Sequence, residues 1–200
     1  MVDKKVYDPL TVPGQKSLRD YTHIRAYHAC RTESEDSYRK DGIRLLSYDE
    51  LLAMTKSHLE QIGIMEERIK TAFDDYWSEY EQNKNQRHVY LNAWKEELLT
   101  YSGHYLVYGS EMINAVACTI GGLVYQNTLK RIGKPTLIVC DVPISDIERE
   151  DLQYLEEHLP ITQDTSIRVK SIKPKDIIRF EYPRKIFDPL QWVNYYYNDT

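Results

Sequence analysis

The sequence predicts an α+β fold with a long helical insertion, and three patterns lead to this prediction. Apolar residues recur every three or four positions over residues 51–80, as in an amphipathic helix. The segment TLIVCDVPI is a nearly continuous apolar run, which is typical of a strand buried on both faces. Near the C-terminus, TSIRVKSI and DIIRFEYP have the pattern of two strands joined by a Lys-Pro-Lys turn.

The elements before the insertion are predicted from local signals. The alternation in HIRAYHAC predicts a first strand over about residues 21–30. One or two helical turns over residues 35–40 follow, and Gly42 is placed to end them. Ser47 to Glu50 has the pattern of a capping box, in which both side chains satisfy free backbone amides at a helix start. This box opens the amphipathic helix, which we expect to break at Gly63.

The elements after the long helix are less regular. HVYLNAWKEELLTY continues a helical period, so we expect the insertion to cover about residues 47–101. GHYLVYG is then expected as a short strand, and Ser110 as the cap of the next helix. A second capping box, Ser145 to Glu148, is expected to start the helix DIEREDLQYLEEHL.

Length and composition place limits on the function. Two hundred residues suffice for one domain with its own core, and we expect one domain over residues 1–200 with an aromatic tail at about 184–200. A net charge of −5 offers no broad basic surface for nucleic acid or anionic lipid. No apolar run approaches the roughly 18 residues that span a bilayer, so we expect a cytoplasmic protein with no membrane partner.

Cysteine and histidine give no metal-site pattern. The three cysteines, Cys30, Cys118 and Cys140, are too scattered for a disulfide framework or a paired CxxC site. The six histidines lack a ligand spacing such as HExxH, so no metal is expected. Cys30 and His28 share a strand face without a third member of a catalytic triad, which disfavours a cysteine hydrolase.

Three segments carry a family resemblance. YHACR, residues 27–31, combines histidine, a small residue, cysteine and arginine in a strand. SGHYLVYGSEMINAVA, residues 102–117, has a Gly-x-Tyr pattern followed by a serine and a helix. TSIRVKSIKPKDIIRFE closes the series. In this order they resemble the ADP-ribosyltransferase family, the fold of poly(ADP-ribose) polymerases and bacterial mono-ADP-ribosylating toxins. The resemblance implies an α+β, split β-sheet core around the helical insertion.

The resemblance also implies an NAD site. His28 would hydrogen-bond a ribose hydroxyl of NAD, the backbone of Ala29 would pair with the nicotinamide carboxamide, and Tyr105 would stack on the nicotinamide ring. Arg31, or alternatively Arg25, would meet the pyrophosphate as a fork of donors. The implied NAD-binding set is completed by two further side chains, Cys30 and Ser110.

The glutamate that usually completes this family's site is missing. The matching region reads LPITQDTSIRV, so its place falls among Gln163, Asp164, Thr165 and Ser166. Asp164 keeps a carboxylate, and Gln163 could hold a ribose hydroxyl, so the implied catalytic set is His28, Tyr105, Gln163 and Asp164. Loss of the glutamate argues against polymer synthesis.

Mono-ADP-ribosylation is therefore the expected activity: one ADP-ribose passes from NAD, as co-substrate, to a protein or nucleic acid acceptor, and nicotinamide leaves. Three alternatives stay open, namely an NAD glycohydrolase, a catalytically inactive interaction module and, more weakly, a tRNA 2′-phosphotransferase-like enzyme. A cleft filled by aromatic residues of the insertion, for example Trp77 or Trp94, would favour the module. A protein partner is considered for the helical insertion and for the aromatic tail.

Overall fold

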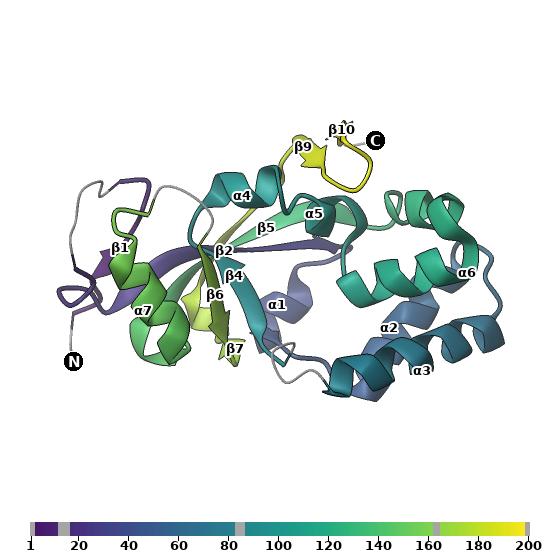
Figure 1. The fold of residues 1–200 in the computed structure, drawn as a ribbon, viewed down its shortest axis with the longest axis horizontal. Helices are drawn as coiled ribbons and strands as arrows, with labels where there is room; N and C mark the ends of the chain where they lie inside the picture. Colours follow the sequence, from purple (N-terminus) through teal and green to yellow (C-terminus); the bar gives the residue numbers. More distant parts are fainter. Residues whose placement is uncertain (1–2, 12–16, 83–86, 162–164, 199–200) are drawn as a thin grey trace.

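The computed structural model describes residues 3–11, 17–82, 87–161 and 165–198, and Figure 1 shows their arrangement. The strands and helices in chain order are β1 (Val6–Tyr7), β2 (His23–Thr32), α1 (Asp36–Asp41), β3 (Ile43–Arg44), α2 (Tyr48–Glu60), α3 (Glu66–Gln82), β4 (Val89–Asn92), α4 (Lys95–Leu99), α5 (His104–Tyr108), α6 (Glu111–Leu129), β5 (Lys134–Pro143), α7 (Arg149–Glu157), β6 (Ser166–Val169), β7 (Ser171–Ile172), β8 (Ile177–Glu181), β9 (Lys185–Asp188) and β10 (Val193–Tyr196). The fold is thus a mixture of helices and mostly antiparallel sheets, as the sequence predicts.

The main sheet is built around β2. Its strand order is β6-β4-β2-β5-β8, with β1 also beside β2. β2 pairs with β5 along its whole length, from His23 opposite Pro143 to Thr32 opposite Lys134. On its other side, β2 meets β4 in the pair Tyr27 with Asn92. No further β2–β4 pair follows among the described residues, so the second half of β2 presents an edge beside the start of β4.

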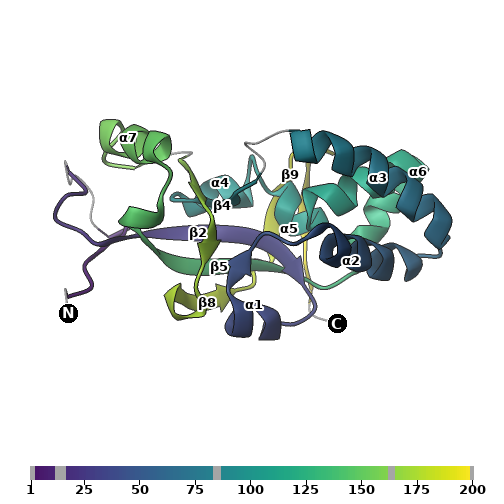
Figure 2. The same cartoon turned by 90° about the horizontal axis from the view of Figure 1, so that it is seen from below.

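The apolar run in β5 is buried on both sides, as predicted. Side chains alternate between the two faces of a strand. Leu137 and Val139 lie in one core with α2, α3, α5 and α6, and Ile138 and Cys140 lie in a second core with β1, β4 and α7. Figures 1 and 2 both show α2, α3 and α6 gathered at one end of the sheet.

The first half of the helical insertion follows the sequence signals. Ser47 and Glu50 form the predicted capping box at the start of α2. Gly63, at φ +83°, separates α2 from α3, as predicted. The helix expected over residues 88–101 is wrong in its first part, because Val89 and Leu91 are buried in the second core and extend the sheet as β4. The remainder of that segment contains the short helix α4.

The strand expected at GHYLVYG is also wrong. His104–Tyr108 forms the one-turn helix α5, bounded by Gly103 and by Gly109 at φ +85°. Leu106, Val107 and Tyr108 are all buried, and a helical turn is what lets three consecutive side chains pack between β2 and α6. Tertiary packing here overrides the β preference of valine and tyrosine.

The end of α1 and the start of α7 were also predicted from the sequence. α1 ends at Gly42, whose φ of +77° confirms its predicted role at the end of this helix. The second predicted capping box is wrong, because Glu148 stands at the start of α7 and makes no side-chain cap, and Ser145 Oγ bonds to Asp146 instead.

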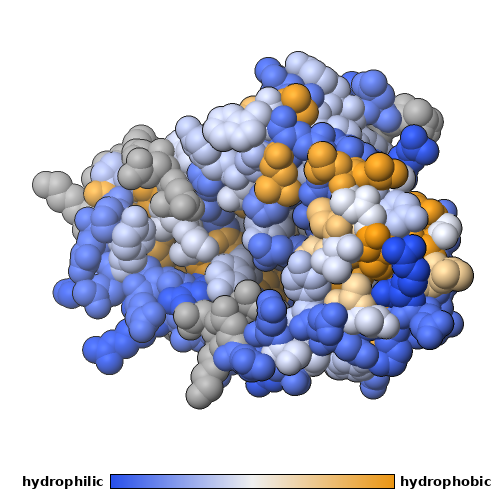
Figure 3. All heavy atoms as spheres, turned by 45° about the vertical axis from the view of Figure 1, so that its right-hand side comes forward, coloured by the Kyte–Doolittle hydropathy of each residue, from blue (hydrophilic) through white to orange (hydrophobic). Residues whose placement is uncertain are grey.

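The aromatic tail folds as the hairpin β9–β10 beside α5. Its Tyr195 hydroxyl reaches the backbone carbonyl of Lys130 at 3.2 Å, so the tail packs on the domain, while Trp192 is 80% exposed. Figure 3 brings the helical end of the molecule forward and shows apolar side chains on that surface. A protein partner for the tail or the insertion stays a prediction. No helix of the described residues is both long and apolar enough to cross a bilayer.

Candidate functional site

A cleft of about 1070 Å³ lies where β4 leaves β2. Its walls come from the second half of β2, from β4, from α5 and the start of α6, and from the insertion helices α2 and α3. It is lined by seven residues that the sequence argument placed at the site or at the missing glutamate's position: His28, Ala29, Cys30, Arg31, Tyr105, Ser110 and Ser166. The cleft therefore brings together residues from three separate segments of the chain.

His28 has a defined tautomer. Its Nδ1 lies 2.9 Å from the backbone oxygen of Tyr90 on β4. A carbonyl oxygen can only accept, so Nδ1 carries the hydrogen and Nε2 of the neutral ring keeps a lone pair. Burial lowers the pKa of His28, and the bond to Tyr90 opposes this only in part. The neutral imidazole can therefore accept a hydrogen bond from a ligand hydroxyl through Nε2.

Tyr105 lines the cleft from α5 and points its hydroxyl toward an acid. The hydroxyl donates to Glu111 Oε2 at 3.5 Å. Burial, followed by the charge of Glu111 and this hydrogen bond, raises the pKa of Tyr105 to about 12. The phenol thus stays protonated at neutral pH. The ring of His104 packs against that of Tyr105, with 4.1 Å between the ring centroids.

Ser110 occupies the N-cap position of α6, as predicted, and its carbonyl accepts from the amide of Asn114. Its side chain makes no cap hydrogen bond, although serine at this position usually does. Ser110 lines the cleft, as does the next residue, Glu111. The start of α6 therefore supplies a hydroxyl and a carboxylate to the same cleft.

Arg31 lines the cleft, but its guanidinium is already engaged. It donates to the backbone oxygens of Ile132 at 2.9 Å and Leu106 at 3.2 Å, and to those of Lys130 at 2.8 Å and Gly133 at 2.7 Å. These bonds tie β2 to α5 and to the turn between α6 and β5. Arg31 therefore acts on the framework of the cleft, and it offers few donors for a pyrophosphate.

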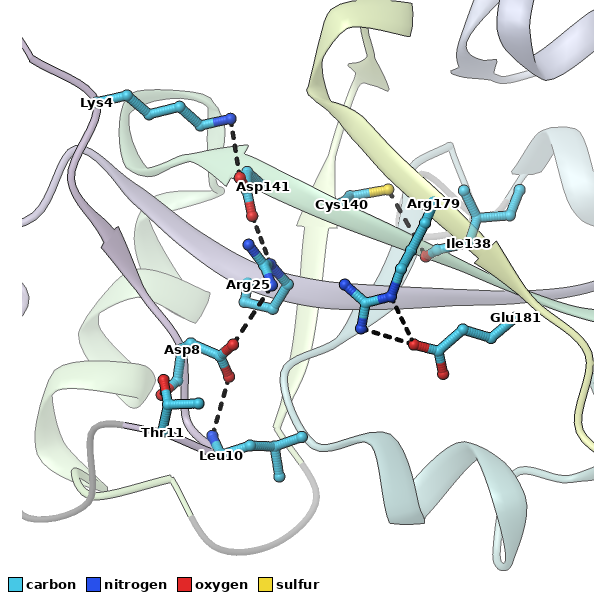
Figure 4. A network of polar contacts seen from close by, with 10 residues as sticks. All are labelled: Lys4, Asp8, Leu10, Thr11, Arg25, Ile138, Cys140, Asp141, Arg179 and Glu181. Atoms are coloured by element: carbon cyan, nitrogen blue, oxygen red, sulfur yellow. Dashed lines mark hydrogen bonds and ion pairs between the residues drawn. The ribbon is translucent and has the colours of Figure 1, made fainter.

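Arg25, the alternative arginine, lies away from the cleft. Figure 4 shows it between two acids: Nε is 2.5 Å from Asp141 Oδ1, and Nη1 is 3.4 Å from Asp8 Oδ2. Lys4 adds a second cation to Asp141 at 2.8 Å. Arg25 is absent from the described lining of the cleft, and its contacts indicate a role in holding β1 and the N-terminal segment on the sheet.

Cys30 lines the cleft as a neutral thiol. Its Sγ lies 3.7 Å from the backbone oxygen of Thr136. Burial raises the pKa of Cys30 to about 12, although the nearby Tyr38 hydroxyl opposes the shift. Because the thiolate is the nucleophilic form, Cys30 is unsuited to nucleophilic catalysis in this environment.

The late-strand candidates are only partly described. Gln163 and Asp164 lie outside the described residues. Ser166, the first residue of β6, pairs with Asn92 of β4, and both line the cleft. The start of this strand thus borders the cleft.

Glu111 and Tyr90 are site residues that the sequence argument missed. Glu111 follows the predicted cap Ser110, where an acid is ordinarily explained by the helix dipole. Tyr90 was assigned to a helix rather than to β4. The spacing of six residues between Tyr105 and Glu111 carries no signal until α5 is known to be a helical turn that folds back toward α6.

No family model, no curated protein and no solved structure matches this chain. The resemblance to ADP-ribosyltransferases therefore stays a prediction from the three motifs.

Proposed function

We propose that the protein binds NAD in this cleft and transfers one ADP-ribose to a macromolecular acceptor, with release of nicotinamide. One observation carries the proposal: His28 and Ala29 of β2 and Tyr105 of α5 line a single cleft with the chemistry that the motifs require. Nε2 of His28 is an acceptor for a ribose hydroxyl, Tyr105 supplies an aromatic ring, and Ala29 is a small residue in the wall of the same cleft.

The residues fit the nicotinamide riboside half of NAD best. An aromatic face and a small residue suit a flat ring with a carboxamide. For the pyrophosphate, Arg31 is committed to backbone carbonyls, whereas Arg44 also lines the cleft, is exposed, and is paired with Glu50 at 2.5 Å. A pyrophosphate could take over the Arg44 guanidinium from Glu50 as a bidentate partner.

The transfer is a displacement at C1′ of the ribose. The electron pair of the C1′–N bond leaves with nicotinamide, a nucleophile of the acceptor forms the new bond to C1′, and that nucleophile gives up a proton. Positive charge builds on the ribose during the step, as in glycoside hydrolysis. Fixed negative or dipolar groups in the cleft therefore favour the reaction.

The position of the insertion tryptophans supports an open cleft rather than a filled one. Trp77 stacks on Phe73 with 5.9 Å between ring centroids and packs against Tyr48, and Trp94 packs in the second core. Neither is among the described lining residues. Two other aromatic residues of the insertion, Tyr76 and Tyr80 of α3, do line the cleft, so only the positions of the two tryptophans count against the interaction module.

The test is nicotinamide release from NAD by the purified protein, with and without cell lysate. His28→Ala and Tyr105→Ala should each abolish release. His158→Ala and Tyr154→Ala are matched controls, since these residues are exposed on α7 or just after it, and stack on each other outside the cleft. Release that depends on lysate supports the transferase, and equal release in buffer supports a glycohydrolase. Absence of both release and NAD binding would leave the interaction module.

A further inference from the structure

The cleft contains a carboxylate that the sequence motifs did not assign. We infer that Glu111 is the acid that acts on the reacting ribose in this chain, in place of the glutamate missing from the late strand. The inference rests on the proposed NAD reaction, and it concerns which residue supplies the negative charge.

The first support is position. Glu111 is the first residue of α6 and lines the cleft together with Ser110 before it. Its Oε2 accepts from the Tyr105 hydroxyl at 3.5 Å. The carboxylate is therefore placed beside the ring that is proposed to hold nicotinamide. In the proposed complex, nicotinamide stacks on the Tyr105 ring. The C1′ atom of NAD is bonded directly to nicotinamide, so the reacting atom would also lie near Tyr105 and its neighbour Glu111.

The second support is availability. Glu50, another carboxylate of the cleft, is paired with Arg44 and with the backbone amide of Ser47. For Glu111, the ion pairs among the described residues include no lysine or arginine partner. Within the described part of the chain, no ion pair neutralises the charge of Glu111. Glu79 of the same cleft shares this property, but the hydrogen bond to Tyr105 belongs to Glu111.

The third support is its electrostatic reach. The charge of Glu111 contributes, after burial, to the raised pKa of Tyr105, and it also adds to the raised pKa of Tyr90 across the cleft. His28 bonds to the backbone of this same Tyr90. The carboxylate of Glu111 therefore lies near enough to both tyrosines to affect them, and His28 is bonded to one of the two residues.

The chemical role follows from the balance of the reaction. As the C1′–N bond breaks, the carboxylate stabilises the positive charge on the ribose. As the acceptor nucleophile bonds to C1′, the carboxylate takes its proton. An amide in place of the acid could still accept the Tyr105 hydrogen bond, but it could supply neither the charge nor the base.

Glu111→Gln is therefore the informative variant. Loss of one base or one electrostatic stabiliser typically lowers the rate by about 10²–10³-fold, and we expect nicotinamide release to fall by that factor. NAD affinity, measured by calorimetry, should change by less than about threefold. Glu79→Gln is the matched control, because Glu79 is a carboxylate of the same cleft on α3, and it should keep the wild-type rate.

A second variant separates chemistry from folding. Glu111→Ala should also lose activity, and added formate should restore part of it by supplying a carboxylate, whereas chloride at the same ionic strength should not. If the wild-type protein releases nicotinamide and the Glu111→Gln protein releases it at the same rate, the role of Glu111 is overturned. A loss in Asp164→Asn alone would assign the acid to the late strand. Wild-type protein that binds no NAD would instead overturn the proposed function and this inference with it.

Discussion

Arg31→Met should strongly destabilise the protein, because this guanidinium satisfies backbone carbonyls of α5 and of the turn between α6 and β5. It donates to four backbone oxygens, at distances of 2.7–3.2 Å. Among the described residues no carboxylate pairs with it, and the Tyr195 hydroxyl is its nearest polar side chain, at 3.5 Å. Methionine keeps an unbranched apolar stem and removes every donor.

The magnitude follows from the hydrogen bonds lost. A hydrogen bond from a charged donor contributes about 1.5–3 kcal/mol, and each buried carbonyl left without a donor costs about 1–3 kcal/mol. Two effects reduce this loss: some of the freed carbonyls will accept hydrogen bonds from water, and burying methionine costs less free energy than burying a guanidinium. We therefore expect a loss of about 3–5 kcal/mol, which is a large part of the stability of a typical domain.

Urea unfolding, followed by tryptophan fluorescence, measures this loss from the midpoint and slope. Arg39→Met is the control, because Arg39 is exposed and pairs with Glu35 one helical turn away, so its loss should cost at most about 0.5 kcal/mol. If Arg31→Met proves too unstable to purify, Arg31→Lys, with fewer donors, should show an intermediate loss. An Arg31→Met protein within about 1 kcal/mol of wild type would refute the bridging role.

Three further predictions test other parts of the structure. Because the pKa of His28 is lowered in the fold, the unfolded chain binds its proton first as the pH falls. The free energy of unfolding should therefore decrease below about pH 6.5, and less steeply in His28→Gln, in urea titrations at several pH values. Gly103→Ala should displace the β9–β10 hairpin, because a Cβ there would lie 2.0 Å from the Phe187 oxygen, and limited proteolysis should cut the tail faster. Ser47→Ala removes one half of the capping box with Glu50 and should lower the melting temperature through a loss of about 1 kcal/mol, whereas an unchanged value would contradict the cap.

The parts of the fold that the sequence predicted correctly carry strong local signals. The capping box at Ser47, the break at Gly63 and the apolar run in β5 each depend on a few neighbouring residues. The prediction for α5 was wrong because its five residues, rich in valine and tyrosine, favour a strand locally. Packing between β2 and α6 makes the segment helical instead. The prediction for β4 was wrong because its four residues are too few to outweigh the helical pattern of the residues around them.

The candidate site was predictable where one segment supplies a motif. His28 and Ala29 lie in a strand whose existence and direction were clear from alternation. The hydrogen bonds of Arg31 to backbone carbonyls could not be predicted from the sequence, because the four partner residues lie 75 to 102 positions away in the chain. Glu111 was hidden for a similar reason, since its contact with Tyr105 depends on the turn between α5 and α6.

The position of β2 in the sheet has a consequence for synthesis on the ribosome. Cys30 and Thr136 face each other across β2 and β5, yet 106 residues separate them in the chain. At about 5–20 residues per second, the partner of β2 leaves the ribosome roughly 5–20 s after β2 itself. During that interval the edge of β2 that will pair with β5 is exposed to other nascent chains. The strand order of the finished sheet therefore sets a shortest time for assembly of the cleft, and it makes early shielding of β2 by a chaperone advantageous to the cell.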